Sequence, residues 1–185
     1  MANTAKFIHE AGALKLTKRS GWWMAGVRNP ESVAEHSQRA ALIAFVLARE
    51  EGASRNEALE YAFALLLHDL PEARLLDLHK VSQRYINAKK AEARVKKEQF
   101  ALLPPALRRD FEDLTKRYDS ALGRDADLLE CAFQAKEYEE QGFVLVRDWS
   151  KRIERCLKTK SAKKLFAELK KKKTVPWWLG LKKTV

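Results

Sequence analysis

The spacing of side chains after Pro30 is the sequence feature that most constrains the fold. Side chains expected to face a core recur there in steps of three and four residues, at Val33, His36, Ala40, Ile43 and Leu47. Such steps are typical of one buried face of an α-helix, which repeats about every 3.6 residues. The chain has only 7 glycines and 5 prolines, and no segment shows the sustained alternation of a strand. The sequence therefore predicts an all-α protein.

Similar patterns divide the rest of the chain into helical segments. The predicted helices cover residues 5–17, 30–51, 55–69, 80–101, 105–119, 125–140 and 149–172. Pro104 and Pro105 mark a break, because proline can begin a helix but does not continue one. A chain of 185 residues with 46% hydrophobic content can bury one sizeable core. We therefore expect one domain over residues 1–185, with a core of about 14–150 and a basic helical extension over 151–185.

Positive charge is concentrated in that extension. Residues 1–150 hold 23 Lys+Arg against 23 Asp+Glu, whereas residues 151–185 hold 13 against 2, so the extension accounts for the formal net charge of +11. A basic helix ending in Lys170–Lys173 can steer anionic substrates or simply be solvated. The aromatic residues are not interleaved with the basic run as a base-stacking platform needs, so nucleic-acid binding is not expected.

Apolar side chains in the same region predict how it packs. Leu165, Phe166 and Leu169 indicate a helix with one face on the body of the protein, and Trp177 and Trp178 are expected to anchor the end of the chain.

The cysteines and the hydropathy pattern favour a cytoplasmic protein. Cys131 and Cys156 lie inside helical patterns, which favours two small buried side chains over a disulfide. The first residues lack a long apolar core, and no stretch reaches membrane-spanning length. We therefore expect no membrane partner.

The adjacent residues His68 and Asp69 are the strongest candidates for chemistry. They follow the apolar run 62–67 at the end of a predicted helix. Imidazole nitrogen and carboxylate oxygen are good ligands for Mn, Fe, Co or Zn, but two adjacent residues cannot complete a coordination sphere. His36 and Asp127 lie in other helical segments and could supply the missing ligands. Buried imidazoles and carboxylates are costly unless paired or metal-bound, which favours a site over isolated core residues.

Three motifs around these residues resemble the HD-domain phosphohydrolases, and within them the 5'-deoxynucleotidase-like branch. The motifs read NPESVAEHS, HDLPEARLLDLHKVSQRYI and RDADLLECAFQAKEYE, and the resemblance runs from about Leu14 to Trp178. It implies a single all-helical HD-domain bundle. It also implies a divalent metal ion, Mn, Co, Fe, Mg or Zn, held by His36, His68, Asp69 and Asp127.

Asp125 is the alternative ligand in the third motif. The family pattern places the ligand just before an apolar pair, here Leu128 and Leu129, so Asp127 is preferred. Asp125 is expected instead to cap the N-terminus of its own helix.

The resemblance assigns further roles near the metal. Glu72 would handle protons for water or for the leaving oxygen, with Pro71 ending the preceding helix; the alternative is a solvated surface glutamate. Asp77 would meet the sugar. Leu78, His79 and Lys80 would meet the rest of the nucleotide, unless 77–80 is an ordinary polar loop.

The segment KRSGWW supplies the remaining substrate candidates. Arg19 would orient the phosphate, because a guanidinium offers a planar fork to phosphate oxygens, and Arg28 is its substitute. Trp22 would offer a flat face to the base. The alternative is that the tryptophan pair closes the core over the first helix.

Together these implications predict a metal-dependent phosphomonoesterase that hydrolyses 5'-deoxynucleoside monophosphates to deoxynucleoside and phosphate, and a homodimer by resemblance. One alternative is another HD phosphohydrolase that acts on a triphosphate, a cyclic dinucleotide or an alarmone. A second is a non-catalytic polyanion-binding module that uses the basic end.

Overall fold

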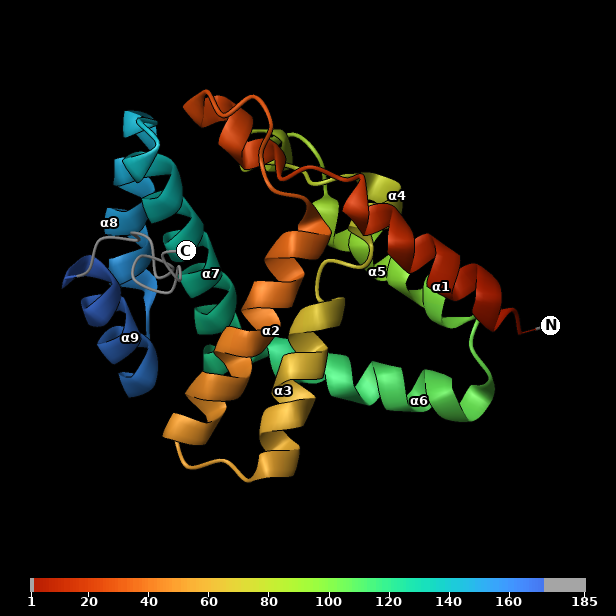
Figure 1. Cartoon of the computed structure of the whole chain (residues 1–185). Helices are drawn as coiled ribbons and strands as arrows, with labels where there is room; N and C mark the ends of the chain where they lie inside the picture. Colours follow the sequence, from red (N-terminus) through yellow and green to blue (C-terminus); the bar gives the residue numbers. More distant parts are fainter. Residues whose placement is uncertain (1, 172–185) are drawn as a thin grey trace, which may run out of the picture.

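Helices α2 (Val33–Glu50) and α3 (Arg55–Leu67) form the centre of the fold in the computed structural model, which describes residues 2–171 (Figure 1). Each begins at a capping box. The hydroxyl of Ser32 accepts the Glu35 N–H while the Glu35 carboxylate accepts the Ser32 N–H, and Ser54 forms the same arrangement with Glu57. These reciprocal bonds satisfy two backbone donors that the first turn of a helix leaves without partners.

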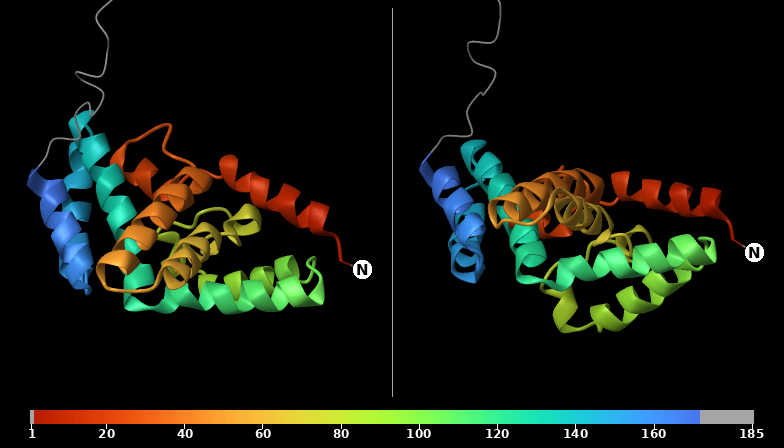
Figure 2. Two further views of the ribbon diagram at one scale, coloured as in Figure 1. Left: turned by 60° about the horizontal axis from the view of Figure 1, so that its bottom comes forward. Right: turned by 90° about the horizontal axis from the view of Figure 1, so that it is seen from below.

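Further helices cover α2 and α3 on two sides. On one side lies α7 (Ala121–Glu140), which carries α8 (Arg147–Cys156) and α9 (Lys160–Lys171) on its far face (Figures 1 and 2). The other side is built from α1 (Thr4–Gly12), α4 (Glu72–Leu75), α5 (Ala88–Phe100) and α6 (Pro105–Leu114). Short 3-10 turns connect them, at Ala13–Lys15, Ser20–Ala25, Ser82–Arg84, Thr115–Asp119 and Val144–Val146.

Two apolar clusters meet along α2. One joins α2, α3, α7, α8 and α9 and contains Ala40, Leu65 and Phe166 among its buried members. The other gathers α1, α5 and the turn after α3 around Val33 and Leu70. Each fully buried large side chain contributes about 1.5–3 kcal/mol relative to an exposed one. His36 lies one turn after Val33 and one turn before Ala40, so it stands where the two clusters join.

The described residues confirm the predicted all-α class, since they contain helices and no strand. The buried stripe Val33, His36, Ala40, Ile43 and Leu47 is as predicted. Pro105 occupies the first turn of α6, as the predicted break at Pro104–Pro105 requires. Several boundaries were predicted wrongly. The helix predicted over 80–101 begins only at Ala88, where the Asn87 side chain caps it, and α7 begins at Ala121 rather than at residue 125. The helix predicted over 5–17 ends at Gly12, and the one predicted over 30–51 begins at Val33.

The predicted single helix over 149–172 is wrong, because the chain forms two helices there. Leu157 is buried in extended conformation between α8 and α9. Asp125 stabilises this break. Its carboxylate accepts the backbone N–H groups of Lys158 and Thr159 at 2.7–3.1 Å. The predicted role of Asp125 as a cap of its own helix is therefore also wrong, since Ser120 caps α7 and Asp125 binds the start of α9.

The C-terminal helices pack on the body of the protein. Phe166 and Leu169 are buried in the main cluster, as predicted for that helix, whereas Lys172, Lys173, Trp177 and Trp178 lie outside the described residues. Cys156 is exposed rather than buried, because it ends α8 at the surface. Among the helices that the structure describes, none is both long and apolar enough to span a lipid bilayer.

Candidate metal centre and active site

The structure brings together ligand atoms from α2, from the end of α3 and from α7. The Nε2 atoms of His36 and His68 lie 3.2 Å apart, and Oδ1 of Asp127 lies 3.2 Å from the former. Oδ2 of Asp69 lies 3.0 Å from Nε2 of His68. His36, His68 and Asp127 each offer a ligand atom within 4.8 Å of the other two. The four predicted ligands therefore share one site.

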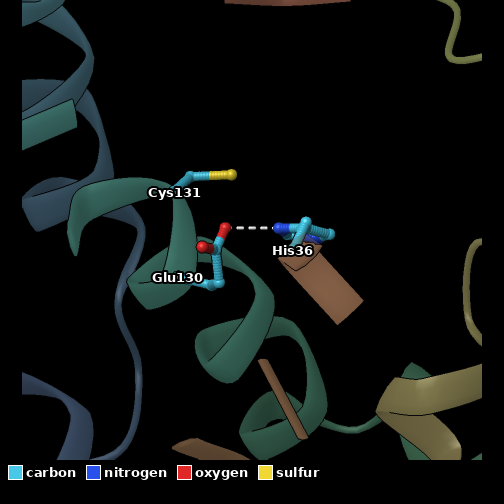
Figure 3. A group of neighbouring side chains, drawn as sticks. All are labelled: His36, Glu130 and Cys131. Carbon is cyan, nitrogen blue, oxygen red and sulfur yellow. Dashed lines mark hydrogen bonds and ion pairs between the residues drawn. The ribbon is translucent and has the colours of Figure 1, made fainter. Parts of the chain in front are cut away.

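The imidazoles are turned so that both Nε2 atoms face this site. Nδ1 of His68 donates to the carbonyl of Leu65 one turn earlier in α3, at 2.6 Å. Nδ1 of His36 pairs with the carboxylate of Glu130 on α7, next to Cys131 (Figure 3). A histidine that donates from Nδ1 keeps a lone pair on Nε2, which is the state that binds a metal.

A buried ion-pair network lies behind His36. The carboxylate of Glu130 is fully buried and accepts two hydrogen bonds from Arg39, at 2.8 and 2.9 Å, and Arg39 also donates to Glu137 and Gln134. Burial raises the pKa of Glu130, but hydrogen bonds and charge from His36 and Arg39 lower it overall. The sequence analysis missed this network. The available signal was that Glu130 stands one helical turn after Asp127.

The electrostatics of the site favour a cation. Burial and the Arg19 charge lower the pKa of His36, but hydrogen bonds to Asp127 and Glu130 outweigh them and raise it to about 10. Without a metal the imidazole is therefore itself a cation, and a bound metal ion would take the place of its Nε2 proton. For Asp69, burial raises the pKa, and the charges and hydrogen bonds of His68, Arg19 and His36 bring it down to about 2. The carboxylates thus stay ionised, and the site holds two imidazole nitrogens and anionic oxygens. This donor set fits a divalent transition-metal ion.

Tyr118 touches two of the predicted ligands and was also missed. Its hydroxyl donates to Oδ2 of Asp127 at 3.0 Å, and its ring lies 4.9 Å from that of His68. The guanidinium of Arg124 covers the ring at 4.0 Å. A tyrosine between a histidine and a carboxylate restricts the orientation of both.

Arg19 reaches the same site from the turn that precedes Ser20–Ala25. Its guanidinium donates to Oδ2 of Asp69 at 3.3 Å and to Sγ of Cys131 at 3.2 Å. Its side chain is 16% exposed, so it is open to a ligand at one edge. A guanidinium beside a metal-ligand set is placed to meet a phosphate oxygen.

Asp77 lies next to Arg19 because it is bound to Ser20. The Ser20 N–H donates to Oδ2 of Asp77, and the Ser20 hydroxyl donates to the Asp77 carbonyl at 2.6 Å. Residue 77 therefore joins the site through a contact that the sequence analysis did not foresee.

Glu72 starts the short helix α4, one turn after the end of α3, where Pro71 separates the two helices as predicted. Burial, followed by the charges of Asp69 and Asp77, raises the pKa of Glu72 to about 10. Its Oε2 atom is buried and has no hydrogen-bond partner among the described residues. At neutral pH this side chain is a neutral acid that can donate a proton.

The remaining predicted substrate contacts lie elsewhere. Trp22 is only 1% exposed, stacks on Trp149 with ring centroids 4.4 Å apart and donates from Nε1 to Glu31. Its ring therefore has no exposed face for a base. The alternative, in which the tryptophan pair closes the core over the first helix, also differs from the structure, because Trp22 packs against Tyr138 and Trp149 while Trp23 is exposed. Arg28 is exposed at the surface.

Leu78, His79 and Lys80 bond within their own loop. The Leu78 carbonyl and the Lys80 ammonium group both bind Gln83, and His79 binds Ser82. Their nucleotide contacts stay a prediction.

The chain is similar in sequence to known proteins. The sequence profile of the HD domain matches residues 11–170. The chain is 30% identical over 146 residues to 5'-deoxynucleotidase HDDC2 from Mus musculus, covering 75% of this chain and 71% of that protein.

Solved structures share the fold. The protein of coding region AF1432 from Archaeoglobus fulgidus is 40% identical, with a TM-score of 0.70 over 95% of this chain and 98% of that one. The cyanophage S-2L HD phosphohydrolase DatZ, bound to dA and one catalytic Zn²⁺ ion, covers 89% of this chain and 96% of its own at a TM-score of 0.52. Its 18% identity makes it a likeness of fold alone. From the profile match and the identity to HDDC2, the chain belongs to the HD-domain family of metal-dependent phosphohydrolases.

Proposed function

We propose that this protein hydrolyses 5'-deoxynucleoside monophosphates to deoxynucleoside and phosphate. The observation that carries the proposal is the position of Arg19. Its guanidinium donates to Asp69 at the edge of the His36–His68 pair, so a phosphate that meets the metal-ligand set also meets a fixed cation. The identity to 5'-deoxynucleotidases supports the substrate class.

His36, His68, Asp69 and Asp127 would hold a divalent ion. Such an ion supplies a Lewis acid that neutralises phosphoryl charge and lowers the pKa of water toward neutrality. Nδ1 contacts from Glu130 and Leu65 keep both imidazoles in the ligating tautomer.

The protein's own side chains handle substrate and proton. Arg19 orients the phosphate by donating to its oxygens. Glu72, whose pKa is raised by burial and by the charges of Asp69 and Asp77, donates its proton to the 5'-oxygen of the leaving deoxynucleoside. Asp77 meets the sugar, and Leu78, His79 and Lys80 meet the rest of the nucleotide.

A phosphate-release screen tests the proposal. Chelator-stripped protein is supplied with Mn, Co, Mg, Fe or Zn and with nucleoside mono-, di- and triphosphates, ribo and deoxy. We expect metal-dependent release from deoxynucleoside monophosphates above all others. Preference for a triphosphate, or hydrolysis only of a cyclic dinucleotide or an alarmone, would replace the proposed substrate.

Two variants separate metal binding from proton transfer. Asp69→Asn is expected to lose both metal and activity, because one ligand of four is impaired. Glu72→Gln is expected to keep metal and lose about 10²- to 10⁴-fold in rate, the usual contribution of one positioned acid. Tight, salt-sensitive RNA or DNA binding without any metal-dependent turnover would favour the polyanion-binding module instead.

Location and assembly belong to the same proposal. We place the protein in the cytoplasm, where nucleotide substrates occur, and expect a homodimer. Light scattering of the purified protein tests the homodimer, and a monomeric mass would contradict it.

A further inference from the structure

Ser20 joins two parts of the candidate site that are 57 residues apart in the chain. It is only 6% exposed, and both of its donors bind Asp77, the N–H to the carboxylate and the hydroxyl to the carbonyl. Two hydrogen bonds to one residue restrict both the distance and the relative rotation of the two segments. A single hydrogen bond would leave the rotation free.

The guanidinium of Arg19 depends on this attachment. The guanidinium has two contacts of its own, a long one to Asp69 at 3.3 Å and one to the sulfur of Cys131 at 3.2 Å. The backbone around it is held more firmly. The Arg19 N–H donates to the Glu31 carbonyl at 3.0 Å on one side, and Ser20 binds Asp77 on the other. The position of the guanidinium therefore depends on its anchored backbone as well as on these two contacts.

The other end of the attachment is strained. Leu76, directly before Asp77, has φ +61° and ψ 166°, and it is the non-glycine residue with positive φ among the described residues. This conformation suits glycine and is unfavourable for other residues. The Leu76 side chain is 64% exposed, so its packing does not hold the conformation. The conformation is held instead by the hydrogen bonds between Ser20 and Asp77 and by the bond from the Leu76 N–H to the Glu72 carbonyl.

We propose that Ser20 is a positioning residue that locks the phosphate-binding Arg19 to the loop starting at Leu76, so that phosphate and sugar contacts form as one unit. This inference rests on the proposed function. It also assigns Asp77 a structural role, which is to hold Ser20, because its carboxylate accepts the Ser20 N–H.

Ser20→Ala removes the hydroxyl bond and leaves the N–H bond. Ser20→Thr keeps both donors. The matched control is Ser161→Ala, the same change at a serine of α9 that is 4% exposed and lies outside the site. Binding of inorganic phosphate to the metal-loaded protein, measured by calorimetry, reports on Arg19 without turnover. Metal content, KM and kcat for a deoxynucleoside monophosphate are measured in parallel.

We expect Ser20→Ala to weaken phosphate binding and raise KM by about 3- to 10-fold, the usual effect of one lost hydrogen bond, with metal content unchanged. Ser20→Thr should restore most of the binding, and Ser161→Ala should match the unmodified protein. In an Arg19→Ala background the Ser20→Ala change should have no further effect on phosphate binding, because Ser20 acts through Arg19.

Equal phosphate binding by Ser20→Ala and Ser161→Ala would overturn the inference, as would an undiminished Ser20→Ala effect in the Arg19→Ala background or loss of metal. Absence of turnover in the unmodified protein, with phosphate binding still shifted by Ser20→Ala, would count against the proposed function alone. An unmodified protein that binds no phosphate would overturn both.

Discussion

The carboxylate of Glu130 sits against Nδ1 of His36, and both side chains are fully buried. Arg39 donates two hydrogen bonds to the other carboxylate oxygen of Glu130. The imidazole is therefore held between a buried anion on one nitrogen and the metal-ligand set on the other. A carboxylate in this position fixes the tautomer of the histidine and makes Nε2 a stronger ligand.

Glu130→Gln tests this arrangement. The amide oxygen can still accept from Nδ1, but the negative charge is lost, and we expect metal affinity to fall by about 10- to 100-fold. Competition with a chromophoric chelator measures the affinity. Glu137→Gln is the control, because Glu137 lies on the same helix as Glu130 and pairs with Arg39 rather than with His36. Equal affinities for the two variants would contradict the role given to Glu130.

Tyr118→Phe tests a second support of the metal centre. It removes the hydrogen bond to Asp127 and keeps the ring beside His68. One hydrogen bond to a charged group is worth about 1.5–3 kcal/mol, so we expect metal affinity to fall by about 10- to 100-fold. Tyr118→Leu, which also loses the ring contact, should lose more. The visible spectrum of the Co²⁺-loaded protein reports the change, and an unaltered spectrum and affinity in Tyr118→Phe would refute the assigned contact.

The buried stripe of α2 could be read from the sequence because local spacing determines which face of a helix is buried. The same spacing placed His36 inside, and the HD motif supplied His68 and Asp69. The pairing of His36 with Glu130 joins residues 94 positions apart, and no local pattern encodes it.

Two errors have a tertiary origin. Asp125 was expected to cap its own helix, but the structure buries it against the start of α9, and this contact also explains why 149–172 is two helices. Trp22 was expected to offer its face to a base, but Trp149, 127 positions later, covers it. The Asp125 error is also partly local, because Ser120 rather than Asp125 caps α7, which begins at Ala121.

Gly123→Ala should destabilise the fold near the metal centre. A Cβ atom on Gly123, in the first turn of α7, would lie 2.6 Å from the Tyr118 carbonyl oxygen and 2.7 Å from its Cα atom. The backbone must shift to relieve that overlap, and overpacking of this kind typically costs about 1–3 kcal/mol. Denaturant titration measures the loss. Gly12→Ala is the control, since nothing lies within 4 Å of its added Cβ, and a loss no larger than the control's would contradict the close approach.

Glu72 should make the metal-free protein less stable as the pH rises. Its pKa is about 10 in the folded chain and 4.5 as its ordinary value. Between these values the folded state binds more protons than the unfolded state, so the free energy of unfolding falls with increasing pH. Glu72→Gln removes the titrating group, so the free energy of unfolding should fall less steeply with pH over the whole range between these two pKa values.

The matched variant for that experiment is Glu31→Gln. Burial, followed by the charge of Glu130, raises the pKa of Glu31 only to about 7, so Glu31→Gln should flatten the decline only below that pH. Denaturant titrations of chelator-treated protein at pH 5 to 9 measure both variants against the unmodified chain. The two predictions differ above pH 7. In that range Glu72→Gln should change the pH dependence of the free energy of unfolding, and Glu31→Gln should not. If the slope there is the same in all three proteins, Glu72 is ionised in the folded chain and cannot be the acid that protonates the leaving oxygen.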